Sequence, residues 1–199
     1  MRMLRLSCLA ALSGLTAMLV LSCGAGSSTV TAPTITSFTP SSGVVGTTVT
    51  VTGTGFSTSI TAVTLGGVTV PADTGNVVST TELTFPVPSA AVTGPITIAN
   101  SGGTTSSAMD FIVAPEITAL SPVTGSASEG TPVTVTGSGL MGISTITFGT
   151  TVATPTTQTA NEIIVPVPSG ASVGADTITF TVNPSYDLAS ILSSFTVTK

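Results

Sequence analysis

The sequence predicts an all-β protein with two tandem β-sandwiches behind an N-terminal signal peptide. Three observations predict this class. The chain repeats itself at an offset of 80 to 84 residues, which is the size of a whole domain. Within each repeat, apolar and polar residues alternate with a period of two, as in Thr48–Thr52. No stretch after the signal peptide carries a sustained 3.6-residue apolar repeat, so helices are not expected.

The first 22 residues are typical of an export signal. Arg2 and Arg5 form a short positive region, and Leu9–Leu21 is an apolar stretch too short and wrongly flanked for a membrane-spanning helix. An anchor that stays uncleaved is the alternative to removal.

The end of this signal resembles the lipobox of bacterial lipoproteins, through Val20-Leu21-Ser22-Cys23-Gly24. The resemblance implies that cleavage precedes Cys23 and that this cysteine is lipidated. Cys8 would leave with the signal, so Cys23 would be the lone thiol and no internal disulfide could form. The family's sorting pattern, with glycine rather than aspartate after the cysteine, implies an outer-membrane or cell-surface destination. Residues 23–31 are small and polar and predict a flexible tether.

The two repeats are expected to be the domains 32–114 and 115–199. Each holds six or seven short strand-like runs separated by Gly, Pro, Ser and Asn, which favours a β-sandwich. In the first repeat the runs are Ile35–Phe38, Thr48–Thr52, Ala62–Leu65, Leu83–Phe85, Ile96–Ile98 and Phe111–Val113. The short connection Ala114–Pro115 predicts a stiff or semi-stiff rod.

Both repeats open with a shared motif. Pro33-Thr-Ile-Thr-Ser-Phe-Thr-Pro40-Ser-Ser-Gly43 and then Gly46-Thr-Thr-Val-Thr-Val-Thr-Gly53-Thr-Gly55-Phe56 reappear from Pro115 and from Gly130. The motif resembles the opening of IPT/TIG domains, the early-set immunoglobulin-like modules of plexins and transcription factors. The glycines at 53 and 55 would let the strand end in a conformation closed to larger residues.

Composition excludes most enzymes. The chain has no histidine, and its only basic residues are Arg2, Arg5 and Lys199, so no Ser-His-Asp or Ser-Lys arrangement can form. The eight acids are scattered and are interpreted as solvated surface groups. We therefore expect no catalytic residues, no enzymatic activity and no cofactor.

Metal and nucleic-acid binding are not expected either. The chain lacks the His and free Cys ligands that zinc and copper sites use, and it has no calcium-loop spacing. Asp110 and Glu116, at the domain junction, are interpreted as two exposed acids. The alternative is that they bind a calcium ion there. After Cys23 the chain holds one lysine, no arginine and eight acids, the opposite of what phosphate binding requires.

Carbohydrate is the ligand class that competes with a purely structural role, because modules resembling these occur in glycan-capturing bacterial proteins. Sugar platforms use exposed aromatic rings, but all seven phenylalanines fall at strand or turn positions that predict core. The candidate ligand loop therefore lies before the last strand and offers Asn183, Tyr186 and Asp187. The alternative is a structural loop whose Leu188, Ile191 and Leu192 seal the sandwich.

These features favour a non-catalytic cell-envelope lipoprotein that acts as an adhesive, binding or spacer module. The expected partners are the membrane, through the lipid anchor, and a polysaccharide or protein at the cell surface. One alternative is a surface glycan-binding lipoprotein that uses domain 2. Another is a subunit of a surface assembly, because edge strands poor in charge do little to discourage sheet-to-sheet pairing.

Overall fold

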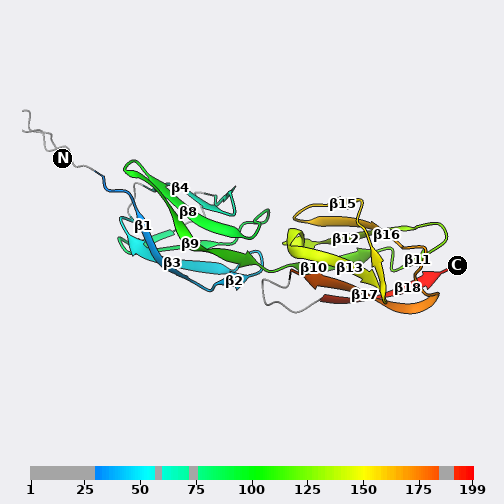
Figure 1. Cartoon of the computed structure of the whole chain (residues 1–199). Coiled ribbons are helices and arrows are strands. Elements are labelled where there is room, and N and C mark those ends of the chain that lie inside the picture. The colour runs from blue at the N-terminus through cyan, green and yellow to red at the C-terminus, as the bar shows by residue number, and fades with distance from the viewer. Residues whose placement is uncertain (1–29, 57–59, 72–75, 184–190) are drawn as a thin grey trace, which may run out of the picture.

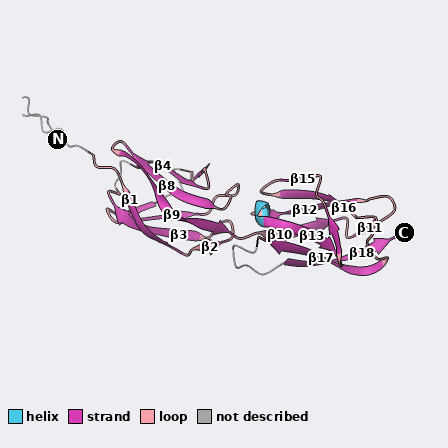
Figure 2. Cartoon of the chain, viewed as in Figure 1, coloured by secondary structure: helices cyan, strands magenta, loops and turns pink. Residues whose placement is uncertain are grey.

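The computed structural model describes residues 30–56, 60–71, 76–183 and 191–199. These residues form two β-sandwiches placed end to end, and the described chain enters domain 1 at one end of the molecule and leaves domain 2 at the other (Figure 1). Strands make up nearly all of the regular structure, and one short 3₁₀ turn, η1 (Leu140–Gly142), is the helix drawn in the described part (Figure 2). The predicted fold class is confirmed.

Domain 1 consists of a four-stranded and a five-stranded sheet. The first has the order β1 (Thr34–Thr39), β3 (Thr48–Thr54), β7 (Glu82–Pro86), β6 (Asn76–Ser79). The second has the order β2 (Ser42–Gly43), β9 (Gly103–Val113), β8 (Gly94–Asn100), β4 (Ile60–Leu65), β5 (Val68–Thr69). The chain changes sheet between β1 and β2, and β2 then runs parallel to β9.

Domain 2 repeats this topology strand for strand. Its four-stranded sheet has the order β10 (Glu116–Ser121), β12 (Pro132–Ser138), β16 (Glu162–Pro166), β15 (Thr157–Gln158). Its five-stranded sheet has the order β11 (Thr124–Ser126), β18 (Ile191–Thr198), β17 (Gly174–Val182), β13 (Ile143–Phe148), β14 (Thr151–Ala153). The repeat in the sequence is therefore a repeat of whole sandwiches.

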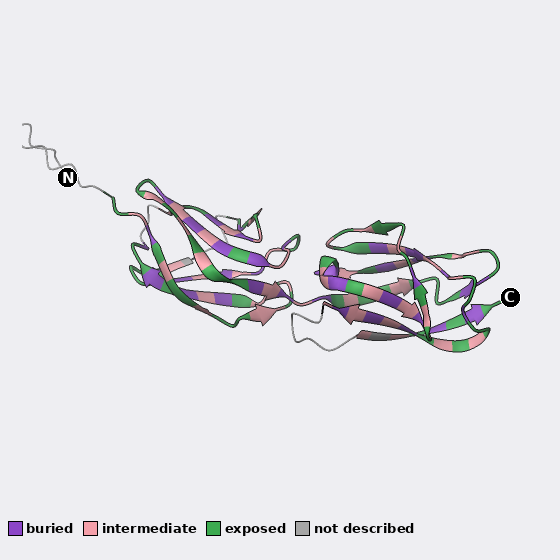
Figure 3. Ribbon diagram, in the orientation of Figure 1, coloured by how far each residue is buried: buried purple, intermediate pink, exposed green. Residues whose placement is uncertain are grey.

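The period-two alternation places one side of each central strand in the core. In β3, Val49 and Val51 are fully buried while Thr48 and Thr52 are exposed, as the banding of the ribbon shows (Figure 3). A fully buried valine of this kind contributes about 1.5–3 kcal/mol relative to an exposed one. The outward threonines suit the pleated surface because β-branched side chains favour extended backbone.

Each domain has its own hydrophobic core, and the phenylalanines occupy it as predicted. Six are buried and Phe38 is half-buried against the first core. Phe56 is a fully buried plug in domain 1, and Leu140 takes its place in domain 2. Phe148 and Phe195 pack edge to face, with ring centroids 5.2 Å apart. The buried phenylalanines are Phe56, Phe85, Phe111, Phe148, Phe180 and Phe195.

The glycine turns that follow β3 and β12, Gly53–Gly55 and Gly137–Gly139, allow main chain to lie against main chain. A Cβ on Gly53 would overlap the carbonyl oxygen of Thr34, and one on Gly137 would overlap that of Glu116. Gly55 and Gly139 have φ of 74° and 63°, in the left-handed region that favours glycine. The predicted need for glycine here is confirmed.

The proposed division at Ala114–Pro115 can be tested with a matched pair of core deletions. Because Phe148 lies in one core and Phe85 in the other, we expect Phe148→Ala to destabilise domain 2 alone and Phe85→Ala domain 1 alone, by about 3–5 kcal/mol each. Urea unfolding followed by residue-resolved NMR would show two separately shifted transitions. A single transition lowered equally by both variants would contradict the division.

Candidate functional site

The candidate ligand loop begins at the end of domain 2 that faces domain 1. Val182 closes β17 opposite Ile143, and the Asn183 N–H donates a 3.1 Å hydrogen bond to the carbonyl of Gly142. Asn183 is half-buried, whereas Tyr186 and Asp187 lie outside the described residues and stay predictions. The loop therefore starts at the end of domain 2 that faces domain 1 rather than at the free end of the molecule.

The connection that carries this loop is longer than its counterpart in domain 1. Eight residues (183–190) separate β17 from β18, whereas Ser101 and Gly102 alone separate β8 from β9. In domain 1 the turn is closed by Asn100, whose Oδ1 accepts a 2.8 Å hydrogen bond from the Gly102 N–H. Residues beyond what a hairpin requires are where rigid scaffolds commonly carry binding groups. The comparison of the repeats therefore favours the loop of domain 2 over the matching turn of domain 1.

The 3₁₀ turn η1 and the glycine that precedes it lie at the junction between the domains. A Cβ on Gly139 would approach the carbonyl oxygen of Ala114 to 2.8 Å and Cγ1 of Val113 to 3.1 Å, so the chain leaving domain 1 lies directly on the glycine turn of domain 2. Gln158 is hydrogen-bonded to both ends of η1, because its Nε2 donates to the carbonyls of Leu140 at 2.8 Å and Ile143 at 3.0 Å.

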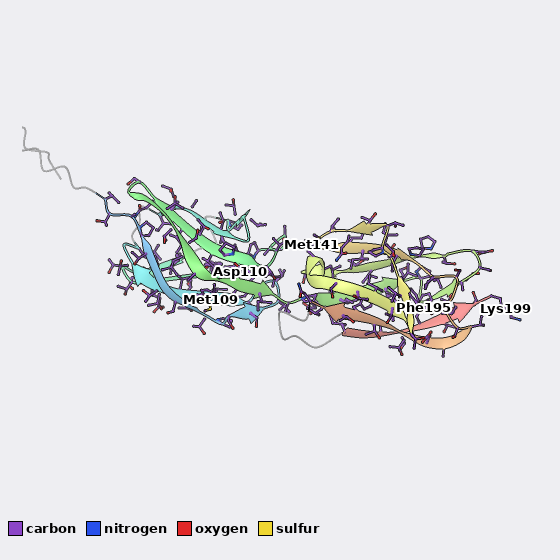
Figure 4. All side chains as sticks on the ribbon, viewed as in Figure 1. Met109, Asp110, Met141, Phe195 and Lys199 are labelled. Carbon is purple, nitrogen blue, oxygen red and sulfur yellow. The ribbon has the colours of Figure 1, made fainter. Side chains whose placement is uncertain are left out.

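Met141 is the exposed side chain of this short turn. It is 52% exposed and lies at the end of domain 2 that faces domain 1 (Figure 4). Motif reasoning did not single it out, because a three-residue turn has no periodic signature. An apolar side chain one residue before Gly142, which is hydrogen-bonded to Asn183, would complement a ligand with both apolar and polar faces.

The segment that precedes domain 1, Val30–Pro33, also packs against glycine turns of the domain that it enters. Gly55 lies against Pro33, and the backbone of Val30 crosses so close to Gly102 that a Cβ there would overlap the Val30 carbonyl oxygen. The buried Asn100 donates from Nδ2 to the Thr31 carbonyl at 2.9 Å. This hydrogen bond ties the last residue of the predicted tether to the sandwich.

Aromatic side chains offer no sugar platform within the described residues, since every phenylalanine there is buried or half-buried. Tyr186 is the aromatic residue that remains for stacking against a sugar ring. The carbohydrate hypothesis for this chain thus depends on the loop that the sequence singled out.

The described acids do not gather into a site. Asp110 and Glu116, which flank the junction in sequence, are both exposed. Glu82 and Glu162 take equivalent places opposite Thr52 and Thr136 in their separate sheets. Among the described residues no three His, Cys, Asp or Glu side chains lie close enough together to hold a metal ion.

Two open depressions lie on domain 2, and sequence reasoning anticipated neither. The larger, of about 510 Å³, lies over β17, β18 and the start of β11, and the smaller, of about 220 Å³, lies beside β13 and β14. The larger is lined by Val123, Thr124, Ala175, Asp176, Thr177, Ser194, Phe195 and Thr196. Apart from Asp176 and Phe195, its lining consists of small hydroxyl and aliphatic side chains, which form no motif that a sequence could reveal.

In the part of the chain that the structure describes, no helix has the length and apolar character that crossing a bilayer requires.

Comparison with known proteins identifies the repeats. The model of the IPT/TIG domain family matches the chain twice, over residues 33–113 and 115–197. Among curated proteins, none matches the sequence.

Among solved structures, the surface glycan-binding protein PbSGBP-B from Prevotella bryantii is similar with a TM-score of 0.51 at 17% identity, covering 81% of this chain and 41% of that one. SGBP-B from a xyloglucan utilization locus of Bacteroides uniformis has a TM-score of 0.39 at 19% identity, covering 82% and 49%. SGBP-B of the Bacteroides ovatus mixed-linkage glucan locus, in complex with a heptasaccharide, has a TM-score of 0.37 at 19% identity, covering 79% and 44%. This chain spans less than half the length of each.

The hydrogen bond from Asn100 to Thr31, which ties residues 30–33 to domain 1, can be tested by mutation. Asn100→Ala removes the donor to Thr31 and the acceptor for Gly102, so we expect a loss of about 1–3 kcal/mol and faster amide exchange in residues 32–35. Hydrogen exchange read by mass spectrometry checks this. Asn161→Ala, at an exposed turn of domain 2, is the matched control. Unchanged exchange at residues 32–35 would show that Asn100 does not hold the segment.

Proposed function

Because the chain belongs to the IPT/TIG domain family, we propose that it is a non-catalytic cell-envelope lipoprotein acting as an adhesive, binding or spacer module. The observation that carries this proposal is the end-to-end arrangement of the two sandwiches, in which Val113–Pro115 passes from one core to the next. Such an arrangement carries domain 2 away from whatever holds the N-terminus.

The proposed anchor is Cys23. Seven residues (24–30) lie between it and Thr31, which Asn100 holds, so domain 1 would stand close to the membrane. Each buried methylene of an acyl chain contributes about 0.8 kcal/mol, and durable attachment requires more than one chain. The triacyl modification implied by the lipobox would provide this, on the outer membrane or at the cell surface.

A binding role fits the chemistry of the chain better than catalysis. No histidine is available as a general base, and no three of the described acids lie close together. The features that remain are surfaces: the junction with Met141 and Asn183, and the open depression over β17 and β18.

The alternative is a surface glycan-binding lipoprotein that uses domain 2. The Prevotella protein, which shares the fold, is a surface glycan-binding protein, although this chain spans 41% of it. The long β17–β18 connection with Asn183, Tyr186 and Asp187 is the feature that favours this alternative. A subunit of a surface assembly is the remaining possibility, supported by the charge-poor strand edges.

The anchor is tested by Cys23→Ala, with Cys8→Ala as the matched control. We expect the first variant to lose acyl label and to keep its signal, so that it migrates as the longer, unprocessed chain. The second should behave as the unaltered chain, because Cys8 is discarded with the signal. Fractionation and palmitate labelling of cells make the measurement. Full membrane association of Cys23→Ala with normal processing would contradict the lipobox assignment.

The glycan alternative predicts saturable binding of the mature chain to a cell-wall or environmental polysaccharide. Tyr186→Ala should weaken that binding by about tenfold or more, as expected for a central aromatic anchor, whereas Tyr186→Phe retains the ring and most of the affinity. Affinity electrophoresis across a polysaccharide panel makes the comparison. Equal mobility shifts for all three chains would remove the loop from the site, and no shift with any polysaccharide would exclude the glycan alternative on that panel.

A further inference from the structure

One strand of domain 2 has a regular edge that is half uncovered. β18 pairs with β17 without a break from Ile191 to Val197, but β11 covers its other side only at Thr196–Thr198. Within the described residues, no strand pairs with the stretch Ile191–Phe195 on that side. We call this stretch the β18 edge.

The backbone groups that the β18 edge presents can be identified. The Thr196 N–H donates to the Val123 carbonyl at 3.0 Å, and the Thr198 carbonyl accepts from the Ala127 N–H at 3.1 Å, both toward β11. Because every second residue of a regular strand faces the same neighbour, the N–H and C=O of Leu192 and Ser194 face the same way. The edge therefore offers two donors and two acceptors.

Domain 1 closes the corresponding edge with a bulge. Between the pairs Pro95–Asp110 and Thr97–Ser106, three residues of β9 lie opposite one residue of β8. The Ser107 hydroxyl fills the gap, accepting from the Ile96 N–H at 3.0 Å and donating to the Met109 carbonyl at 2.6 Å. Met109 and Asp110 stand out from the strand (Figure 4). A bulge of this kind discourages the addition of another strand.

The remaining edges of the described sheets are short or irregular. β1, β6 and β10 each contain a register shift, and β2, β5, β11, β14 and β15 span two or three residues. Among the described strand edges, the β18 edge is thus the one that is neither bulged nor short. The 510 Å³ depression, lined in part by Val123, Ser194 and Thr196, opens beside it.

We propose that the β18 edge pairs antiparallel with the β18 edge of a second copy of this chain. An antiparallel pair about a twofold axis is self-complementary, and Ser194 of each copy would exchange both hydrogen bonds with Leu192 of the other. Little charge opposes this approach. Asp176 is the one acidic residue among those that line the adjacent depression, and its Oδ1 accepts a 2.8 Å hydrogen bond from the Thr177 N–H.

The direction of β18 decides what such a pair would connect. β18 runs from the junction toward the free C-terminal end of the molecule (Figure 1). Antiparallel pairing therefore overlaps the two second domains and points the two first domains away from each other. If the proposed anchor at Cys23 holds, the two anchors lie in facing membranes, and the contact is homophilic adhesion between surfaces.

A five-residue pairing is weak for isolated molecules, so the test uses many copies on one surface. The mature chain is coupled through its lone thiol, Cys23, to phosphatidylcholine vesicles that carry a maleimide lipid, and vesicle clustering is followed by light scattering. Multivalent display can raise apparent affinity by about 10²–10⁴. Because the coupling is chemical, the result is independent of whether cells lipidate Cys23.

Ser194→Pro is the diagnostic variant, since proline lacks the outward N–H and is tolerated at a strand edge whose N–H faces solvent. Ser194→Thr keeps the N–H and is the matched control. We expect the unaltered chain and Ser194→Thr to cluster vesicles, and Ser194→Pro to slow clustering by about tenfold or more. No clustering by the unaltered chain, or equal clustering by a folded Ser194→Pro, overturns the proposal.

A second variant covers the case in which proline unfolds the domain. In the chain with Cys23→Ser, a cysteine at Ser193 would face its own mate across the twofold axis. Mild oxidation should give a covalent dimer of Ser193→Cys and none of Ser106→Cys, which places the thiol on the bulged strand of domain 1. Failure of Ser193→Cys to crosslink, or equal crosslinking of both, overturns the pairing.

Discussion

The contact of main chain with main chain at the glycine turns is the constraint on which the rest of the structure depends. At Gly53 and Gly137, β1 and β10 cross so close that a single methyl group would overlap a carbonyl oxygen. The second glycine of each turn then receives the chain that arrives at the domain, at Pro33 in one case and at Val113–Ala114 in the other. One sequence feature therefore closes each sandwich and also fixes how it is joined to what precedes it.

The molecule is otherwise built with almost no charge. Both cores are filled by Val, Ile, Leu and Phe, and the outward strand positions are threonines that favour extended backbone. Proteins usually protect strand edges with charged side chains, especially lysine. This chain uses short edge strands and bulges instead, as at Ser107–Met109, where a serine hydroxyl replaces a lost ladder acceptor. The β18 edge differs from the others because it is neither short nor bulged.

The sequence predicted what depends on local pattern and on repetition. The alternation in Thr48–Thr52, the buried phenylalanines and the glycine turns were all foreseen, because each follows from strand periodicity or from a backbone that only glycine adopts. The bulge of β9 was not, because Ser107, Ala108 and Met109 carry no turn signal and continue a plausible strand. The hold of Asn100 on Thr31 joins residues far apart in the chain, and η1 is too short to leave a pattern. The candidate loop stays a prediction: the shortage of exposed aromatic residues singled it out, and the roles of Tyr186 and Asp187 depend on contacts that no periodicity encodes.

We infer that the glycine turn of domain 2 holds the two domains in one orientation, so that the chain acts as a rod. The direct measurement is the distance between spin labels on Ser106→Cys in domain 1 and Thr177→Cys in domain 2, in the chain with Cys23→Ser, by pulsed electron paramagnetic resonance. Both positions are exposed strand residues, so neither label disturbs a core. A rod of this kind gives a single narrow distance distribution. A broad distribution, as expected for two domains that reorient freely about Ala114–Pro115, would contradict it.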